Sequence, residues 1–409
     1  MKALQFLTDP EPWPTPVGPD DPLLLQHLAT TPMALVDLAD PEPIADDWLV
    51  MRPRLTGICG SDSKQVLMDF EDGSDNMMTA FISFPQVLGH EVVGTVTETG
   101  PAVEGYETGQ RVLLFPNIGC RARGLSPVCP ACERGDYSIC QQWWDGRLSP
   151  GIHTGNAVEA TGGFAELVPA HTSMAFAVPD HVPDELAVLA DPWSVSFHAI
   201  TRTPPPPGSR VVIIGAGALG TTATAILEGI YDCEVAVVAR WPAQAELARK
   251  RGATVFDAGD PAQLVEELAA WSGATLRRPW EGLPVAYPGQ IDIVYDTVGS
   301  GQTVEIAMRV LAERGSLVQL GVSSPSRFEW TPWYFKELRL IGSNAFGVET
   351  FDGRTAHAYE HFFDLVGGGD IDLSGMLTHT FPLEEWREAF TTIVRAETTG
   401  AIKVAFDQR

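Results

Sequence analysis

Four cysteines lie close together in the chain, at Cys120, Cys129, Cys132 and Cys140. Two residues separate Cys129 from Cys132, seven separate Cys132 from Cys140, and eight separate Cys120 from Cys129. Four thiolates satisfy the tetrahedral coordination of zinc and leave no open position for a substrate. Free or disulfide-bonded thiols are the alternative, but in a chain that stays in a reducing compartment we favour a structural zinc lobe at about residues 117–141.

A second, dispersed set of residues has the chemistry of a catalytic metal site. Cys59 stands in GICGSD, the adjacent His90 and Glu91 in LGHE, and Asp191 in LADPW. Thiolate, imidazole and carboxylate ligands together suit zinc. Taken singly, Cys59 and His90 are more typical of core positions, so the prediction depends on the set as a whole.

A third pattern, GAGALG, contains Gly215, Gly217 and Gly220, with Ala218 and Leu219 before the last glycine. It follows the apolar run RVVII and precedes a helix-like stretch, which is the context of a dinucleotide-binding loop. The first glycine permits a tight turn, the second lets the backbone approach a pyrophosphate, and the third lets the helix pack on the strand. A glycine-rich turn without a ligand is the less favoured alternative.

The end of the next strand distinguishes the two nicotinamide cofactors. A carboxylate there bonds the adenine ribose and repels a 2′-phosphate. Nineteen residues after Gly220 the sequence has Ala239 followed by Arg240, so the carboxylate is absent and a guanidinium is available. We therefore expect NADP(H) in preference to NAD(H), with an Arg240 that binds no ligand as the alternative.

The elements that must position these residues fall into two kinds. Short Val-rich runs separated by Gly and Pro over 88–115 predict a small β-barrel. After the linker TPPPPGSR, apolar strands alternate with helical stretches as far as residue 344, which predicts an α/β region with a doubly wound parallel sheet. The final GAIKVAFD reads as a strand that rejoins the first domain, because a lone edge strand needs a partner.

Charge and composition limit the possible partners. The 409 residues carry 53 acidic and 27 basic side chains, a formal charge of -26, which repels nucleic acid and anionic membranes. The N-terminal MKALQFLTDPEPWP lacks the features of a signal peptide, and no stretch predicts a transmembrane helix. We therefore expect a soluble, cytoplasmic protein with a small-molecule substrate and no nucleic-acid or membrane partner.

In this order, GICGSD, LGHEVVG, the cysteine lobe and GAGALG resemble the zinc-containing medium-chain dehydrogenases, the family of alcohol, sorbitol and threonine dehydrogenases. The resemblance extends over nearly the whole chain. It implies a GroES-like catalytic barrel over 1–193, a Rossmann nicotinamide-binding domain over 194–344, and a return to the catalytic domain over 345–409. It also implies a catalytic zinc between the domains, and a homodimer or homotetramer.

Carried over by position, the resemblance implies that Cys59, His90 and Asp191 bind the catalytic zinc, with Glu91 able to ligate in some states. Where Asp191 stands, sorbitol-type relatives have a glutamate and liver-type alcohol dehydrogenases a cysteine, so the sequence is closer to the polyol-type branch. Two zinc ions per chain are expected, one catalytic and one structural.

The resemblance also implies a mechanism, in which an alcohol or polyol loses a proton and transfers hydride to the nicotinamide, or the corresponding ketone or aldehyde is reduced. Ser61 is the expected first proton acceptor, and a turn hydroxyl is the alternative. Asp62 is expected to orient His90. Lys64 occupies the position where the family often ends its proton relay with a histidine.

Other departures from the family pattern leave roles open. Cys120 lies six residues farther from Cys129 than is usual in the family, and the segments 8–47 and 272–290 look longer than in ordinary relatives. Four residues are weaker candidates for lining the substrate space, with packing the favoured interpretation: Trp143, Trp144, His153 and Phe346.

Two other functions remain as alternatives. One is a zinc-independent reductase of the same superfamily, acting on quinones or enones, against which the complete set of metal ligands argues. The other is a catalytically silent, zinc-stabilised scaffold that binds NADPH. The zinc content distinguishes the scaffold, with one ion per chain, from the dehydrogenase, with two.

Overall fold

A computed structural model of the chain describes residues 1–11, 13, 17–69, 77–322 and 327–409. Its described residues form two compact units. Unit 1 comprises Met1–Asp191 and Leu377–Arg409, and unit 2 comprises Pro192–Met376. Residues 12 and 14–16, within the long 8–47 segment, lie outside the described residues.

Unit 1 contains these strands and helices: β1 (Lys2–Phe6), α1 (Leu23–Thr30), β2 (Met33–Asp37), β3 (Trp48–Gly57), α2 (Gly60–Val66), β4 (Gln86–Val87), β5 (Glu91–Thr99), β6 (Arg111–Leu114), α3 (Pro130–Arg134), β7 (Val168–His171), β8 (Ala175–Ala177), α4 (Asp184–Ala187), β19 (Leu377–Phe381), α12 (Trp386–Val394), α13 (Ala396–Thr399) and β20 (Lys403–Asp407). Short 3₁₀ helices cover Met77–Phe81, Tyr137–Ile139, Thr172–Met174 and Leu383–Glu385.

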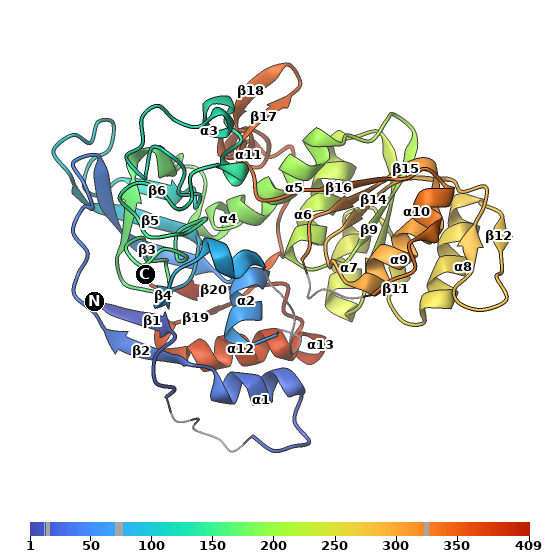
Figure 1. Cartoon of the computed structure of the whole chain (residues 1–409), viewed down its shortest axis with the longest axis horizontal. Helices are drawn as coiled ribbons and strands as arrows, with labels where there is room; N and C mark the ends of the chain where they lie inside the picture. The colour runs from blue at the N-terminus through green and yellow to red at the C-terminus, as the bar shows by residue number, and fades with distance from the viewer. Residues whose placement is uncertain (12, 14–16, 70–76, 323–326) are drawn as a thin grey trace. The chain divides into compact units, whose positions relative to one another are not determined.

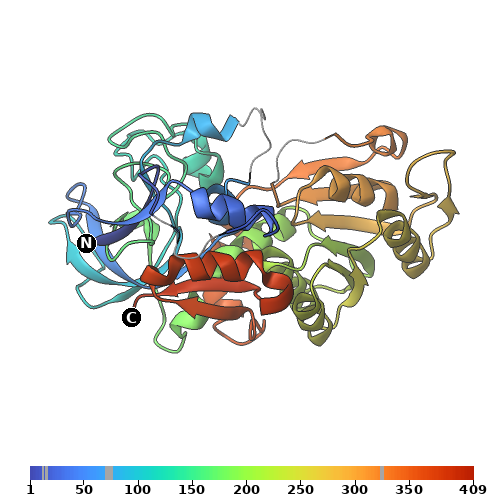
Figure 2. The same cartoon turned by 90° about the horizontal axis from the view of Figure 1, so that it is seen from below.

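The main sheet of unit 1 has the strand order β19-β20-β3-β5-β6-β8, and β7 also pairs with β3 (Figure 1). Its central strand β3 is rich in apolar and β-branched residues, and most of its side chains are buried. The last strand, β20, pairs antiparallel with β3 and parallel with β19, as the sequence predicted for GAIKVAFD. Figure 2 shows β19 and β20 beside helix α12, against which both strands pack.

The long segment 8–47 of unit 1 has structure of its own. Its described part contains α1 and β2, and β2 pairs antiparallel with β1 in a sheet of order β2-β1-β4. Leu25 and Leu28 of α1 belong to the same buried apolar cluster as Trp386 and Phe390 of α12. The segment therefore contributes to the core of unit 1.

Unit 2 contains these elements: α5 (Ala190–Arg202, beginning in unit 1), β9 (Ser209–Ile214), α6 (Ala218–Ile230), β10 (Cys233–Ala239), α7 (Pro242–Lys250), β11 (Thr254–Asp257), α8 (Pro261–Ser272), β12 (Leu276–Arg277), β13 (Val285–Ala286), β14 (Ile291–Asp296), α9 (Gly301–Val310), β15 (Leu311–Gln319), α10 (Thr331–Phe335), β16 (Arg339–Gly342), β17 (Val348–Phe351), β18 (Arg354–His357) and α11 (Ala358–Leu365).

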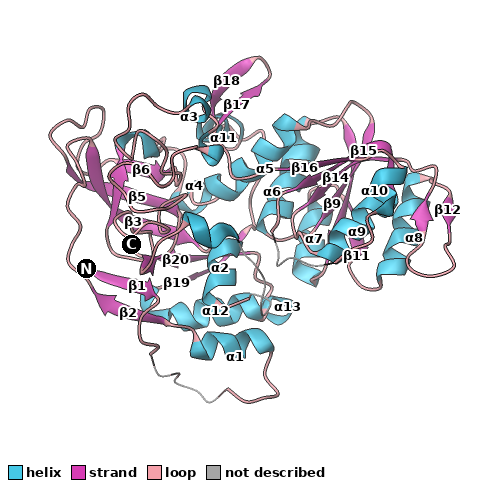
Figure 3. Ribbon diagram, in the orientation of Figure 1, coloured by secondary structure: helices cyan, strands magenta, loops and turns pink. Residues whose placement is uncertain are grey.

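The sheet of unit 2 is parallel, with the order β11-β10-β9-β14-β15-β16. Its strands and the helices that alternate with them are distinguished in Figure 3. The strand order reverses between β9 and β14, and in such sheets ligands bind beyond the carboxyl ends of the strands at this point. The loop after β9 is the GAGALG segment, so the predicted cofactor loop lies at the expected place.

The point at which the chain returns from unit 2 to unit 1 differs from the sequence prediction. The return to the catalytic domain was expected at residue 345, but 345–376 belongs to unit 2. Glu349 of β17 contacts His198 of α5 at 2.5 Å (Oε1 to Nδ1) and accepts a bond from Thr201 at 3.1 Å. Phe362 of α11 packs edge-on against Trp193. The hairpin β17–β18 and helix α11 are therefore held by α5, and the chain leaves unit 2 only after residue 376.

The segment 272–290, also noted as long, forms the short antiparallel pair β12–β13 in unit 2. Within the described part of the chain, no helix has the length and hydropathy needed to cross a bilayer.

Candidate functional site

The structure brings the four clustered cysteines together in unit 1. Their sulfur atoms all lie within 4.8 Å of one another, with Sγ of Cys120 3.7 Å from that of Cys140. This separation excludes a disulfide, whose S–S bond is close to 2 Å. Cys129 caps the N-terminus of helix α3, and its sulfur accepts backbone N–H bonds from Cys132 at 3.5 Å and Gln141 at 3.4 Å. N–H groups aimed at sulfur stabilise a thiolate, so the lobe has the donors of a metal site.

The thiols of the lobe do not titrate alike. A hydrogen bond from Cys132 lowers the pKa of Cys140 to about 5. Burial raises the pKa of Cys120 to about 11. Closely packed thiols acquire different pKa values. The first thiol to ionise is stabilised by hydrogen bonds from the neighbouring S–H groups, and its negative charge then raises the pKa of those neighbours. A cation bound by all four thiolates would offset the repulsion between their negative charges.

Arg123 explains how the lobe accommodates six extra residues between Cys120 and Cys129. Its side chain is almost fully buried, and its guanidinium donates to the carbonyl oxygens of five residues, which lie in two segments of unit 1. The distances are 3.2 Å to Ile118, 3.1 Å to Asp145, 3.0 Å to Leu148, 3.1 Å to Ser149 and 2.8 Å to Gly151. The extra residues therefore form an anchored turn that leaves Cys120 beside the other cysteines.

The second predicted metal group also assembles in unit 1. Ligand atoms of Cys59, His90 and Glu91 lie within 4.8 Å of one another. Cys59 ends the link from β3 to α2, and Glu91 begins β5, which pairs with β3. Asp191, the fourth predicted ligand, is not among the residues brought within this distance, but it is buried, and its Oδ2 has no hydrogen-bond partner among the described residues. A buried carboxylate oxygen without a partner is costly, and a bound cation would satisfy it.

Asp62 holds His90 in place. It accepts the Cys59 backbone N–H at 3.0 Å, and its Oδ1 lies 3.5 Å from Nδ1 of His90. Burial opposes the charge on His90, but Asp62 and the Cys59 sulfur outweigh it and raise its pKa well above the usual value. Burial raises the pKa of Asp191 to about 7, helped by Glu91 and opposed by His90. The group is therefore rich in buried acceptors.

Lys403 is a member of this group that the sequence analysis did not identify. It lies on β20, almost fully buried, forms an ion pair with Glu91, and donates to the carbonyl of Ile58 at 3.0 Å. Burial would lower the pKa of Lys403, but Glu91 and Cys59 more than offset this and raise it. A side chain at Gly57 would overlap both partners, so only glycine leaves room for the pair. A lysine inside the apolar run AIKVAF was the available signal, because a buried ammonium needs a partner.

Ser61 and Lys64 lie on α2, directly after Cys59. Ser61 is exposed and Lys64 is half-buried. Burial lowers the pKa of Lys64, which Asp69 and Cys59 partly oppose. The helix thus places a hydroxyl and an amine close in sequence to the metal group, while Asp62 points inward.

The three glycines of the GAGALG segment in unit 2 differ in the space around them. Gly215 has a φ of +96°, and a Cβ there would lie 2.6 Å from the Thr297 hydroxyl oxygen. A Cβ at Gly217 would meet nothing within 4 Å, whereas one at Gly220 would overlap the Gly215 carbonyl. Gly217 therefore faces open space at the start of α6, as a pyrophosphate site requires.

At the end of β10, Ala239 is buried and Arg240 is exposed. The guanidinium carbon of Arg240 lies 4.6 Å from the centre of the Trp241 ring. Stacking orients a guanidinium and leaves its N–H groups available to a ligand.

The residues that were weaker candidates for lining the substrate space lie in different surroundings. Phe346 is fully buried in unit 2 against His357 and Tyr359, so packing is confirmed for it. Trp144 packs beside Phe81 in unit 1. His153 lies with its ring centre 4.5 Å from that of His90.

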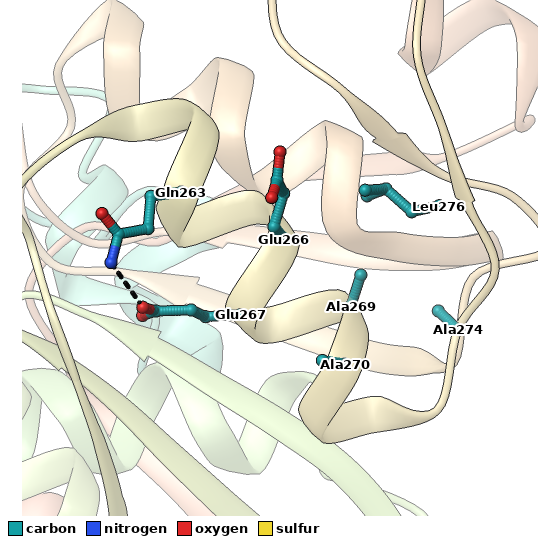
Figure 4. Close-up of a pocket in the computed structure, with 7 residues that line it drawn as sticks. All are labelled: Gln263, Glu266, Glu267, Ala269, Ala270, Ala274 and Leu276. Atoms are coloured by element: carbon teal, nitrogen blue, oxygen red, sulfur yellow. Dashed lines mark hydrogen bonds between the residues drawn. The ribbon is translucent and has the colours of Figure 1, made fainter.

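A surface hollow in unit 2 is lined by residues that belong to none of these groups (Figure 4). Helix α8 and the segment after it line the hollow with Gln263, Glu266, Glu267, Ala269, Ala270, Ala274 and Leu276. Nε2 of Gln263 donates a hydrogen bond to Oε1 of Glu267 at 2.8 Å. The hollow lacks metal ligands and glycine-loop residues, so it is not the candidate site.

Known protein families match both units. The alcohol dehydrogenase GroES-like domain matches residues 45–180, and the zinc-binding dehydrogenase domain matches residues 218–359. A probable diacetyl reductase ((R)-acetoin forming) of Saccharomyces cerevisiae is 29% identical, over 90% of this chain and 85% of its own. The sorbitol dehydrogenase of Bacillus subtilis is 24% identical, over 85% and 87%.

Solved structures have the same fold. A zinc-binding dehydrogenase of Sinorhizobium meliloti bound to NADP is 25% identical, with a TM-score of 0.71 over 99% of this chain and 98% of its own. An Escherichia coli alcohol dehydrogenase in complex with NADH is 21% identical, with a TM-score of 0.73 over 100% and 99%. The expected architecture, a GroES-like domain with a Rossmann domain, is therefore confirmed.

Replacing Lys403 with Met should destabilise unit 1, because Glu91 would remain buried without its cation. Removal of one partner of a buried ion pair costs about 3–5 kcal/mol. Urea unfolding of the zinc-loaded protein measures this loss. Lys2→Met is the matched control, since Lys2 is half-exposed and lies 4.0 Å from Glu384, and it should change stability by less than about 1 kcal/mol. A Lys403→Met, Glu91→Gln double variant should recover part of the loss, and equal losses in the single and double variants would contradict the argument.

Alanine substitutions in the glycine loop should separate folding from cofactor binding. Gly220→Ala should lower stability by about 1–3 kcal/mol, because the methyl group overlaps the Gly215 carbonyl. Gly217→Ala meets no protein atom within 4 Å, so it should fold normally and bind the dinucleotide at least tenfold more weakly. Thermal unfolding and calorimetric titration with NADPH measure the two effects. Wild-type affinity in Gly217→Ala would place the pyrophosphate elsewhere.

Proposed function

The chain belongs to the zinc-type medium-chain dehydrogenase family, and we propose that it transfers hydride between an alcohol or polyol and NADP(H), or reduces the corresponding ketone or aldehyde. The observation that carries the proposal is the group formed by Cys59, His90 and Glu91. The buried carboxylate of Asp191 interacts electrostatically with His90 and Glu91, and its Oδ2 has no hydrogen-bond partner among the described residues. This donor set suits zinc, and a closed structural site would not include such a mixture of charged ligands.

Two zinc ions per chain follow from this proposal. Cys59, His90 and Asp191 would hold the catalytic ion, and the four cysteines of the lobe would hold the structural one. The ion pair with Lys403 holds Glu91 within the group and neutralises its charge. When bound, the catalytic zinc would supply the Lewis acidity that lets an alcohol lose its proton near neutral pH.

Three residues near the metal group have the chemistry to orient a ligand or to transfer a proton. Asp62, whose Oδ1 lies 3.5 Å from Nδ1 of His90, would orient the His90 ring from outside the metal group. Ser61 offers an exposed hydroxyl that can accept the alcohol proton. Lys64, on the same helix, is the next group along the chain that can exchange a proton with solvent.

The preference for NADP(H) rests on the end of β10. No carboxylate stands at Ala239 to bond ribose hydroxyls, and the exposed Arg240 offers charge to a 2′-phosphate. The Sinorhizobium relative crystallised with NADP supports this choice, although the Escherichia coli one was crystallised with NADH.

The experiment that tests the function is cofactor reduction with primary, secondary and polyol substrates, using NADP⁺ and NAD⁺ in parallel. We expect chelator-sensitive turnover with NADP⁺ preferred, and two zinc ions per chain by elemental analysis. Cys59→Ser should retain about one zinc and lose turnover. A preference for NAD⁺ would remove only the cofactor assignment. One zinc with no turnover would favour the silent scaffold, and activity without zinc on quinones or enones would favour the reductase.

We also propose that unit 2 pairs with a second copy of the chain. Strand β16 is an edge of the sheet among the described residues, and Leu340 on it is partly exposed. The adjacent helix α10 exposes Tyr334 and Phe335, 78% and 64% accessible, and Trp330 is exposed just before it. An exposed edge strand beside an aromatic patch is typical of an interaction surface.

Light scattering in solution tests this association. The wild-type protein should have the mass of a dimer or tetramer, and a Tyr334→Arg, Phe335→Arg variant should be a monomer, because the charges would be buried in the interface. Trp280→Arg is the control, since Trp280 is fully exposed but lies between β12 and β13. A wild-type monomer, or an unchanged mass in the double variant, would contradict the proposal.

A further inference from the structure

His153 has a fixed backbone beside the metal group. It forms an isolated β-bridge with Asn117, and Thr154 donates its N–H to the carbonyl of Pro116 at 2.8 Å. The carbonyl of His153 accepts from the N–H of Asn156 at 2.9 Å. These bonds hold the backbone on both sides of the residue.

The hydrogen bonding of the ring determines its chemistry. Nδ1 of His153 lies 2.7 Å from the carbonyl oxygen of Thr154, which can only accept, so Nδ1 must carry the hydrogen. In the neutral ring, Nε2 is then an acceptor. No described residue donates a hydrogen bond to Nε2.

The His153 ring lies next to a predicted metal ligand. The His153 and His90 rings are 4.5 Å apart and tilted by 45°, yet His153 is not part of the group that can hold a metal. Half-buried, it offers a fixed acceptor beside the group without being a ligand. The proton of the reacting hydroxyl is already assigned to Ser61. A second hydroxyl of the substrate is a donor that matches this acceptor.

We propose that Nε2 of His153 accepts a hydrogen bond from a second hydroxyl of the substrate, and so selects vicinal diols, polyols and hydroxy ketones over alcohols with one hydroxyl. This inference rests on the proposed dehydrogenase function. A site built to bond a hydroxyl rejects an analogue that lacks it, because the buried polar group of the site is left unpaired.

The test compares kcat/KM for 2,3-butanediol stereoisomers with kcat/KM for 2-butanol. The wild type should prefer at least one diol, and His153→Phe should lower the diol-to-monool ratio by at least about tenfold. His153→Gln keeps an acceptor oxygen and should retain part of the preference. His181→Phe is the matched control, because His181 is an exposed histidine of unit 1, and it should leave the ratio unchanged. Zinc content is measured for each variant.

The outcomes distinguish this inference from the proposed function. Equal loss of activity on both substrates, or loss of zinc, in His153→Phe would make the residue a packing partner of His90 and overturn the inference. Absence of turnover in the wild type would overturn the proposed function. In that case, calorimetric titration of the zinc- and NADPH-loaded protein with 2,3-butanediol decides the inference. Weaker binding to His153→Phe would uphold it, and equal or undetectable binding to both proteins would overturn it.

Discussion

The ion pair between Lys403 and Glu91 is the constraint on which the rest of unit 1 depends. Cys59, Glu91 and Asp191 place several acidic groups in one buried region, which is unfavourable without positive charge. Lys403 supplies a permanent cation, and only the last strand of the chain carries it there. The pairing of β20 with β3 brings this side chain to Glu91, and the glycine at position 57 of β3 leaves room for it.

In unit 2 the main constraint is the close contact between the backbone at the end of β9 and the start of α6. Gly220 lies against the Gly215 carbonyl, and this contact lets α6 start directly over the end of β9. The strand order reverses beside β9, and Gly217 at the start of α6 faces open space there, where a dinucleotide would bind. Charge compensation in unit 1 and backbone packing in unit 2 therefore prepare two different ligand sites, and each depends on glycine for a different reason.

The sequence predicted those features that local patterns determine. The GAGALG turn, the parallel strands around it and the cysteine lobe each have a short signature that depends on few other residues. The boundary at residue 345 was wrong, because the contacts of Glu349 with His198 and Thr201 join segments about 150 residues apart. Lys403 was missed for the same reason, since its partner precedes it by more than 300 residues. The assignments of ligands and cofactor remain predictions.

Arg123 connects two parts of the molecule that carry different roles. Its five carbonyl acceptors belong to the segments that flank the cysteine lobe on one side and lead to His153 on the other. The inserted turn between Cys120 and Cys129 is therefore a mechanical link between a stabilising element and the surroundings of the reacting group. Loss of the Arg123 guanidinium would therefore leave carbonyl oxygens without their donor in both segments at once, before the cysteine lobe and before His153.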